Sequence, residues 1–399
     1  MAIRRVVLVS SALLSKLQRE DVFVCAQCGY CVKWCPIYDR SGWESTSPRG
    51  KIFLLKKMLE RNGANLFTSN PRMASEFVQR LFDCTTCGRC SEKCHLELDL
   101  LDLWVKLREL AVRQGLAPDS VGIMEKTLIG PKNVFGMDSQ SRRDWATYTG
   151  AEVKVQDQAD VVYFVGCVTS YSGRSQGIAK AITAILNHTG ENWSLMAEEW
   201  CCGHPLGVSG ATEGYREIAE HNVRTIENMH AKIVVSGCPG CCLAFREEYP
   251  RVLGRKPNFE VMHFAQLLDR YITEGKIRIP KLDATATYHD PCELGRLGGV
   301  VEEPRRVIGS FVENFIEPEE NGRFGRCCGA GGLLKATNSA MSAELAEKRL
   351  TMLNSTGAQV VVSACPSCDQ NLWEASSKLP DSKRVQDLAE LVAQQMSLI

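Results

Sequence analysis

Four short apolar runs, each followed closely by a cysteine, dominate the hydrophobic pattern beyond residue 158. They cover residues 160–166, 232–237, 284–290 and 359–364, and they lead to Cys167, Cys238, Cys292 and Cys365. Three of these runs are rich in valine, and runs of this length indicate buried strands. Segments 173–188, 214–230 and 339–355 have helical patterns and supply the crossovers that parallel strands require. The pattern predicts parallel sheets whose carboxyl ends carry the cysteines.

The first 115 residues have helical rather than strand periodicity. Apolar positions repeat at helical spacing over residues 49–61, from Pro71 onward, and over residues 98–113. Residues 116–158 contain scattered glycines and charges, and we expect a linker that packs on the surface. Residues 6–14 imitate a short signal peptide without a convincing cleavage site, so we expect an amphipathic N-terminal helix instead.

Charge and hydropathy exclude two classes of partner. Lysine plus arginine equals aspartate plus glutamate at 47 each, so no net charge draws the chain to nucleic acid or to an anionic membrane. The sequence contains no run of 18 apolar residues, so it predicts no membrane-spanning helix. A cytoplasmic location is expected, because thiols stay reduced there, with peripheral attachment to a membrane partner as an option.

Two repeated frameworks contain eighteen of the nineteen cysteines. The first is a run of four that occurs twice, as Cys25, Cys28, Cys31 and Cys35 and as Cys84, Cys87, Cys90 and Cys94. The second is a set of five that also occurs twice, as Cys167, Cys201, Cys202, Cys238 and Cys241 and as Cys292, Cys327, Cys328, Cys365 and Cys368. Thiolates at this density indicate iron-sulfur clusters, and therefore a protein that handles electrons.

Disulfides and structural zinc are the alternatives. A disulfide framework is typical of short secreted chains, whereas this chain has 399 residues, an odd cysteine count and adjacent cysteine pairs. Zinc sites use pairs of Cys-x2-Cys knuckles, but three cysteines at steps of three and a fourth four residues later match the bacterial ferredoxin run. Both alternatives are disfavoured.

In two-cluster ferredoxins the fourth cysteine of each run binds the other cluster. By that rule one 4Fe-4S cubane takes Cys25, Cys28, Cys31 and Cys94, and the second takes Cys84, Cys87, Cys90 and Cys35. The 48 residues between Cys35 and Cys84 are too many for a minimal ferredoxin loop and should hold helices. The N-terminal part is thus expected to be a helical domain around two cubanes.

The five-cysteine sets indicate a duplication. The separation is 125 residues from Cys167 to Cys292, 126 from Cys202 to Cys328 and 127 from Cys238 to Cys365. Ligands of open parallel sheets bind beyond the carboxyl ends of the strands, where these cysteines are expected. The glycine after each double cysteine is expected to let the backbone approach a bulky cluster.

Each half carries the Cys…Cys-Cys-Gly…Cys-x2-Cys signature of the cysteine-rich, or CCG, domain. Nearly the whole chain resembles the heterodisulfide reductase family, in the D-subunit form that fuses a ferredoxin-like C subunit to a B subunit. The expected fold is α+β and α/β: a helical ferredoxin-like domain (1–115), a linker (116–158), and two Rossmann-like CCG domains (159–283 and 284–399).

The resemblance implies a cofactor and a reaction. In the B-type subunits each complete set of five cysteines holds a noncubane 4Fe-4S cluster, and a disulfide is reduced between the two clusters. Both sets are complete here, so all ten of their cysteines become candidates for the reaction site, supplied with electrons by the two cubanes. His204, His289 and Asp290 lie beside these cysteines and are candidates for proton delivery or for tuning the clusters. Cys242 is expected to be a packing residue.

The resemblance leaves three functions open. They are a subunit that reduces a thiol-derived disulfide, a relay in an electron-bifurcating or benzoyl-CoA reductase type complex of anaerobes, and the partner of a 2-hydroxyacid oxidase. The last is disfavoured because such relatives typically lack part of the first set. No flavin or nicotinamide motif is present, so electrons must come from a partner. The candidates are an A-type flavin subunit, a ferredoxin, a hydrogenase or formate dehydrogenase module, or a cytochrome b.

Overall fold

The computed structural model describes residues 22–62, 66–67, 70–380 and 382–399, so the expected helix over residues 6–14 lies outside the described part. The chain divides into two compact units. The first unit joins residues up to Ile123 with two later segments, Pro205–Thr212 and Gly329–Leu345. The second unit holds the rest of the chain, including both sets of five cysteines.

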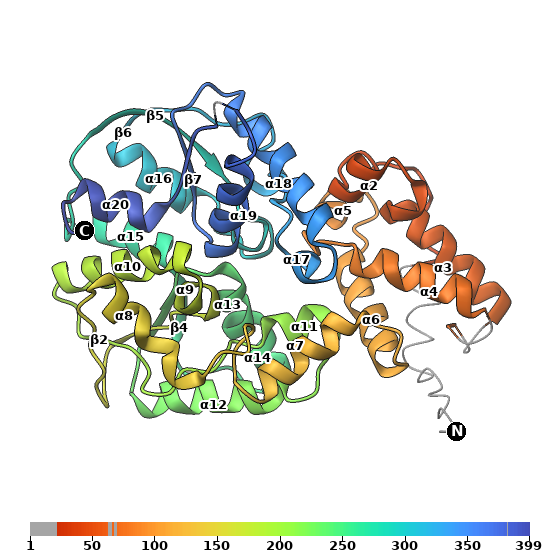
Figure 1. Ribbon diagram of the computed structural model, residues 1–399, viewed down its shortest axis with the longest axis horizontal. Helices are drawn as coiled ribbons and strands as arrows, with labels where there is room; N and C mark the ends of the chain where they lie inside the picture. The colour runs from red at the N-terminus through yellow and green to blue at the C-terminus, as the bar shows by residue number, and fades with distance from the viewer. Residues whose placement is uncertain (1–21, 63–65, 68–69, 381) are drawn as a thin grey trace. The chain divides into compact units, whose positions relative to one another are not determined.

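Helices build the first unit, as the sequence predicts (Figure 1). They are α2 (Pro36–Ser41), η2 (Glu44–Thr46), α3 (Pro48–Asn62), α4 (Pro71–Phe82), α5 (Arg89–Glu92) and α6 (Leu100–Arg113). Two begin at side-chain caps, since Asn70 accepts from the Met73 amide and Asp99 accepts from the Asp102 amide. Buried apolar side chains of α3, α4 and α6 form the core between the cysteine runs.

Arg108 of α6 joins separate segments within this unit. Its guanidinium is fully buried and donates to backbone carbonyls: Leu81 at 2.8 and 3.1 Å, Cys84 at 2.6 Å, Val208 at 2.8 Å and Gly332 at 3.1 Å. Burial lowers the pKa of Arg108 to about 10. One cation thus connects the second cysteine run to both inserted segments.

The second unit contains two parallel four-stranded sheets, with strand orders β2-β1-β3-β4 and β6-β5-β7-β8. The predicted strands are present as β1 (Val161–Tyr163), β3 (Ile233–Ser236), β5 (Leu282–His289) and β7 (Val360–Ser363). The others are β2 (Trp193–Ser194), β4 (Glu260–His263), β6 (Val312–Phe315) and β8 (Arg384–Asp387). The predicted fold class, helices followed by duplicated α/β halves, is confirmed.

The two halves pack as related copies. Helix α10 (Gln176–His188) of the first half contacts α20 (Leu388–Gln395) of the second, and α15 (Phe264–Thr273) contacts α16 (Glu302–Phe311). Since α16 is the counterpart of α10 and α20 that of α15, these are the paired contacts of a pseudo-twofold arrangement. One hydrophobic core runs through both halves and includes Tyr163 and its counterpart Tyr288.

The expected linker has more structure than its composition indicates. Residues 116–158 contain α7 (Asp119–Ile129), η3 (Ser139–Arg143) and α8 (Asp144–Thr149). Trp145 of α8 is fully buried in the core of the second unit, which explains why this segment is fixed. The sequence does not reveal these elements, because η3 and α8 have only five and six residues and the glycines of the segment obscure α7.

The remaining described helices are either short turns in the loops that follow the strands or longer helices that connect the strands. They are α9 (Cys167–Tyr171), η4 (Gly173–Ser175), α11 (His204–Ser209), α12 (Tyr215–Asn228), α13 (Pro239–Leu243), η5 (Ala244–Glu248), α14 (Tyr249–Leu253), η6 (Glu293–Leu297), η7 (Gly322–Phe324), α17 (Leu334–Thr337), α18 (Ser339–Asn354) and α19 (Pro366–Ser376). Both η5 and η6 are single π-turns, a form common at functional sites. Both lie next to cysteine sets.

The glycines after the double cysteines also allow close packing between protein segments. Gly203 and Gly329 both have positive φ, at +74° and +91°. A Cβ on Gly203 would lie 2.5 Å from Tyr215, and one on Gly329 would lie 2.5 Å from the Ser342 carbonyl. These glycines therefore allow close packing against α12 and α18.

Candidate functional site

Four cysteines from both N-terminal runs line one cavity of the first unit. They are Cys25, Cys28, Cys31 and Cys94, the set expected for one cubane. Burial, followed by the neighbouring Cys25 thiol, raises the pKa of Cys31 to about 11. Cys28 is exposed, so this cavity lies at the surface of the unit. Four convergent sulfurs around one cavity fit a 4Fe-4S cubane.

The other four cysteines of these runs line a second cavity. They are Cys35, Cys84, Cys87 and Cys90, again the crossed set expected from the ferredoxin rule. Burial raises the pKa of Cys35 to about 12, and the Lys51 ammonium opposes that shift. Lys51 is buried, with its Nζ 4.5 Å from the Trp104 ring centroid. A buried cation here would offset part of the negative charge of four thiolates and a cluster.

The first set of five cysteines forms a chain of touching thiols in the second unit. Each thiol lies close enough to the next to shift its pKa, in the order Cys167, Cys201, Cys202, Cys241 and Cys238. The neighbouring Cys201 and Cys241 thiols lower the pKa of Cys202 to about 7. The structure thus brings the complete set together at the ends of β1 and β3, and its donor chemistry fits an iron-sulfur cluster.

Arg142 and Glu199 support this first set. The Arg142 guanidinium donates to Glu199 at 2.7 Å and to the Cys167 sulfur at 3.3 Å, and both charged side chains are buried. Glu199 also accepts from the amides of Val165 and Gly166 at 2.8 and 3.0 Å. The ion pair therefore fixes the turn that presents Cys167.

Removing the Arg142 donor should lower the reduction potential of the cluster at the first set, because hydrogen bonds to ligand sulfur stabilise the reduced state. The test compares Glu199→Gln with the double variant Glu199→Gln/Arg142→Met, which avoids leaving a buried charge unpaired. Redox titration followed by EPR should give a lower midpoint for that cluster in the double variant alone. Equal midpoints in the two variants would contradict this role.

The second set lies at the ends of β5 and β7. The Cys328 and Cys368 sulfurs are 3.2 Å apart, and Cys365 hydrogen bonds to Cys368. Cys327 is close enough to His289 for its charge to raise the histidine pKa, although burial dominates and lowers it. Cys292 begins the π-turn η6 three residues after β5 ends. The structure thus brings Cys327, Cys328, Cys365 and Cys368 into one region, and Cys292 lies in the loop that follows β5.

The two sets approach each other near the Cys-x2-Cys pair of the first set. Helix α13, which lies between Cys238 and Leu243, contacts η6, which follows Cys292, and a Cβ on Gly240 would lie 3.0 Å from Glu293. His204 lies beside Glu293, with Nδ1 2.8 Å from Glu248 and Nε2 3.3 Å from Glu293. Burial alone would lower the pKa of His204, but these two carboxylates raise it well above its usual value. A protonated imidazole therefore lies next to the region between the sets.

The other two candidate proton donors have different surroundings. Burial, and then the Arg349 cation, lower the pKa of His289 to about 3. Asp290 accepts from Arg305 at 2.8 and 2.9 Å and from the Gly322 amide at 2.8 Å. These contacts engage the Asp290 carboxylate fully, so its arrangement is that of a structural ion pair.

Cys242 is separate from the first set. Its thiol is buried and lies 3.8 Å from the Ser236 carbonyl and 3.7 Å from the Met262 carbonyl. These are contacts of a small side chain in a core, and its neighbour Cys241 is the cysteine that joins the thiol chain. Cys242 is the natural control for substitutions of the other cysteines.

Sequence reasoning missed the charged residues around the sets, namely Arg142, Glu199, Glu248, Glu293 and Arg349. Glu199 and Glu293 lie within two residues of set cysteines in sequence, but their partners, like those of Arg142, Glu248 and Arg349, come from distant segments, and isolated charges carry no spacing signal. Arg349 follows Glu347 and Lys348 in the charged stretch of α18, so the sequence does not mark it as different from a surface residue.

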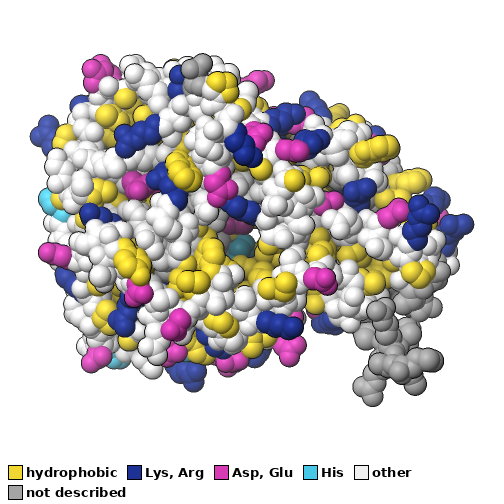
Figure 2. Space-filling view, viewed as in Figure 1, with side chains coloured by type: hydrophobic (Ala, Val, Ile, Leu, Met, Phe, Trp, Pro, Cys, Tyr) yellow, Lys and Arg dark blue, Asp and Glu magenta, His cyan; other side chains and the backbone are white. Residues whose placement is uncertain are grey.

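The exposed surface carries mixed charge. On the visible face, lysine and arginine are interspersed with aspartate and glutamate, as the balanced composition predicts (Figure 2). Within the described residues, no helix is long and apolar enough to cross a membrane.

Comparisons with known proteins agree with this organisation. Residues 21–98 match the family model of the 4Fe-4S dicluster domain, and residues 161–246 and 286–372 match that of the cysteine-rich domain. The crystal structure of a hypothetical protein from Helicobacter pylori superposes with a TM-score of 0.56 at 9% identity, over 97% of this chain and 73% of that one. That likeness is one of fold.

Two curated relatives are more informative. The B subunit of fumarate reductase (CoM/CoB) from Methanothermobacter marburgensis is 28% identical over 374 residues, which cover 92% of this chain and 71% of that protein. The D subunit of dihydromethanophenazine:CoB–CoM heterodisulfide reductase from Methanosarcina mazei is 37% identical over 399 residues, which cover 96% of each protein. The chain therefore belongs to the D-subunit family of heterodisulfide reductases and is an iron-sulfur oxidoreductase subunit.

Proposed function

We propose that this protein reduces a thiol-derived disulfide between its two sets of five cysteines. The observation that carries the proposal is the approach of the two sets within one compact unit, where α13, which contains Cys241, contacts η6, which follows Cys292. Cys25, Cys28, Cys31 and Cys94 would hold one cubane, and Cys35, Cys84, Cys87 and Cys90 the other. Each set of five would hold a noncubane 4Fe-4S cluster.

When bound, the clusters supply single electrons and iron sites with affinity for sulfur. The reaction breaks one sulfur-sulfur bond, and two electrons and two protons convert the disulfide to two thiols. His204 is suited to donate a proton, because Glu248 and Glu293 keep its imidazole charged next to the region between the sets. His289 and Asp290 are engaged by Arg349 and Arg305, so we give them supporting roles.

The electrons must enter from a partner protein. The cavity of Cys25, Cys28, Cys31 and Cys94 is the favoured entry point because Cys28 is exposed. A flavin subunit, a ferredoxin, a hydrogenase or formate dehydrogenase module, or a cytochrome b would each serve as the donor.

Disulfide-dependent oxidation of a reduced viologen dye tests the proposal without the native donor. The anaerobically purified protein, alone and with its native partners, should oxidise the dye when mixed thiol disulfides are added and release two thiols per two electrons. Dye oxidation that never depends on a disulfide, in a protein with its full iron content, would contradict the proposal.

A relay role is the second candidate, and the 28% identity to part of a fumarate reductase favours it. In that case the electrons leave through another subunit, and thiols should neither change the cluster signals nor appear as products. The intact pair of sets favours disulfide reduction, because a relay needs no second complete set.

A further inference from the structure

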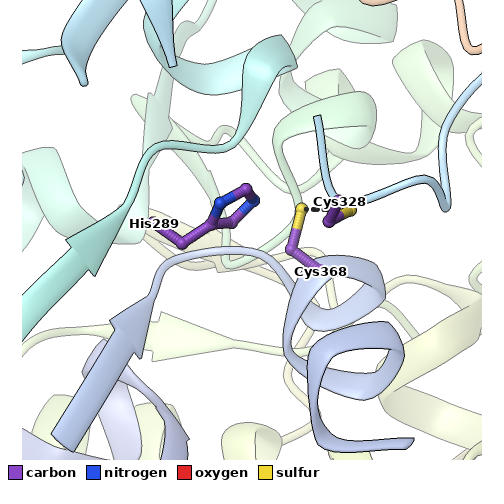
Figure 3. Close-up of side chains that lie close together, drawn as sticks. All are labelled: His289, Cys328 and Cys368. Carbon is purple, nitrogen blue, oxygen red and sulfur yellow. Dashed lines mark hydrogen bonds between the residues drawn. The ribbon is translucent and has the colours of Figure 1, made fainter. Parts of the chain in front are cut away.

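His289 lies against the second set with one ring nitrogen unaccounted for. It ends β5, is fully buried, and its Nε2 has no hydrogen-bond partner among the described residues. A ligand atom of His289 and the sulfurs of Cys328 and Cys368 all lie within 4.8 Å of one another. Figure 3 shows the ring beside the two thiols. Taken alone, this group of three could hold a metal ion through the imidazole.

Arg349 decides how the imidazole can act. Its side chain, on α18, is fully buried, and its Nε donates to Nδ1 of His289 at 3.2 Å. A guanidinium has donors only and stays charged, so Nδ1 must present its lone pair. In a neutral imidazole with Nδ1 as the acceptor, the proton sits on Nε2. The nitrogen that faces the cysteines is therefore an N–H donor with no lone pair to offer to iron.

We propose that His289 donates its Nε2–H to sulfur of the cluster at the second set, raises that cluster's reduction potential, and is not an iron ligand. The inference rests on the proposed function only in that a cluster occupies the second set. It also excludes His289 as a proton relay, because Arg349 blocks the nitrogen that would accept the next proton. Hydrogen bonds to ligand sulfur and sulfide are an established means by which proteins tune cluster potentials.

The first half provides an internal comparison. Counted back from Cys167 and Cys292, the counterpart of His289 is Phe164, which is fully buried and packs edge-on against Phe245. Gly203 packs on Tyr215 and Ile218 of α12, and Gly329 packs on Ser342 and Leu345 of α18. Matching these contacts aligns the sequence of α12 with that of α18.

That alignment makes Asn222 the counterpart of Arg349. Asn222 donates to the Cys201 carbonyl at 3.0 Å and to Tyr249 at 3.0 Å. The first half thus has neither the histidine nor the arginine, so this device belongs to the second site alone.

The test replaces His289 by phenylalanine, the residue of the first half, and titrates both noncubane clusters anaerobically by EPR. The midpoint of the second cluster should fall, the midpoint of the first should stay unchanged, and the iron content should equal that of wild type. An exchangeable-proton coupling to the second cluster, measured by ENDOR after exchange into D2O, should disappear.

His289→Gln is the companion variant, because its amide retains an N–H donor and should keep the midpoint between those of wild type and His289→Phe. If His289→Phe does not fold, His289→Gln still tests the inference. Loss of iron from the second set, strong nitrogen coupling in wild type, or an unchanged midpoint in both variants would overturn the inference. Iron analysis of wild type separates the two proposals: a missing second cluster overturns both, whereas an unchanged midpoint with all clusters present overturns this one alone.

Discussion

Replacing Cys328 by serine should remove the cluster at the second set and abolish disulfide reduction, while both cubanes remain. Cys328 lies 3.2 Å from Cys368 at the centre of the second set, and a serine hydroxyl is a harder, poorer ligand for iron-sulfur clusters than a thiolate. Iron should fall by about 4 atoms per chain. The disulfide-dependent rate should fall by more than about 100-fold, since even changes outside the ligand shell cost up to that much.

Cys242→Ser is the matched control for this substitution. It removes another buried thiol of the same unit, but one whose neighbours are the carbonyls of Ser236 and Met262. Its iron content, EPR signals and rate should match those of wild type. If Cys328→Ser lost a cubane signal, or if both variants behaved alike, the assignment of ligands would be wrong.

Replacing Arg108 by methionine should destabilise the first unit strongly. The substitution leaves the buried carbonyls of Leu81, Cys84, Val208 and Gly332 without this donor. An unsatisfied buried carbonyl costs about 1–3 kcal/mol. Because the surrounding backbone relaxes and recovers part of this cost, we expect the free energy of unfolding to decrease by about 3–5 kcal/mol. The cubane held by Cys84, Cys87, Cys90 and Cys35 should be lost first, because Arg108 binds the Cys84 carbonyl.

Arg113→Met on the same helix is the control, because Arg113 is exposed and pairs with Glu109 on the surface. Thermal unfolding and iron analysis of both variants, prepared anaerobically, measure the difference. A stability of Arg108→Met equal to that of Arg113→Met would show that the buried guanidinium does not hold these segments together.

The sequence predicts the parts of the fold that depend on strong local signals. The valine-rich strands β1, β3 and β7 and the long helices α3, α4 and α6 are all found within a few residues of their expected ranges. The edge strands β2, β4, β6 and β8 lack such a valine-rich run, and they form because they pair with a central neighbour.

In the candidate site, too, some residues can be predicted from the sequence and others cannot. Cysteine spacing predicts which thiols belong together, because a cluster demands several sulfur ligands at fixed separations. The spacing cannot predict the residues that polarise those thiols. Arg142, Glu293 and Arg349 reach their partners through tertiary packing, and the distinct roles of His204 and His289 depend on which charged residues face each ring.

The most direct test of disulfide reduction at two noncubane clusters is iron analysis combined with EPR of the anaerobically purified complex, with and without added thiols. Four occupied sites should give about 16 iron atoms per chain and, after oxidation, a signal that changes when thiols bind. About eight iron atoms per chain, with no thiol-sensitive signal from an oxidised cluster, would contradict the account.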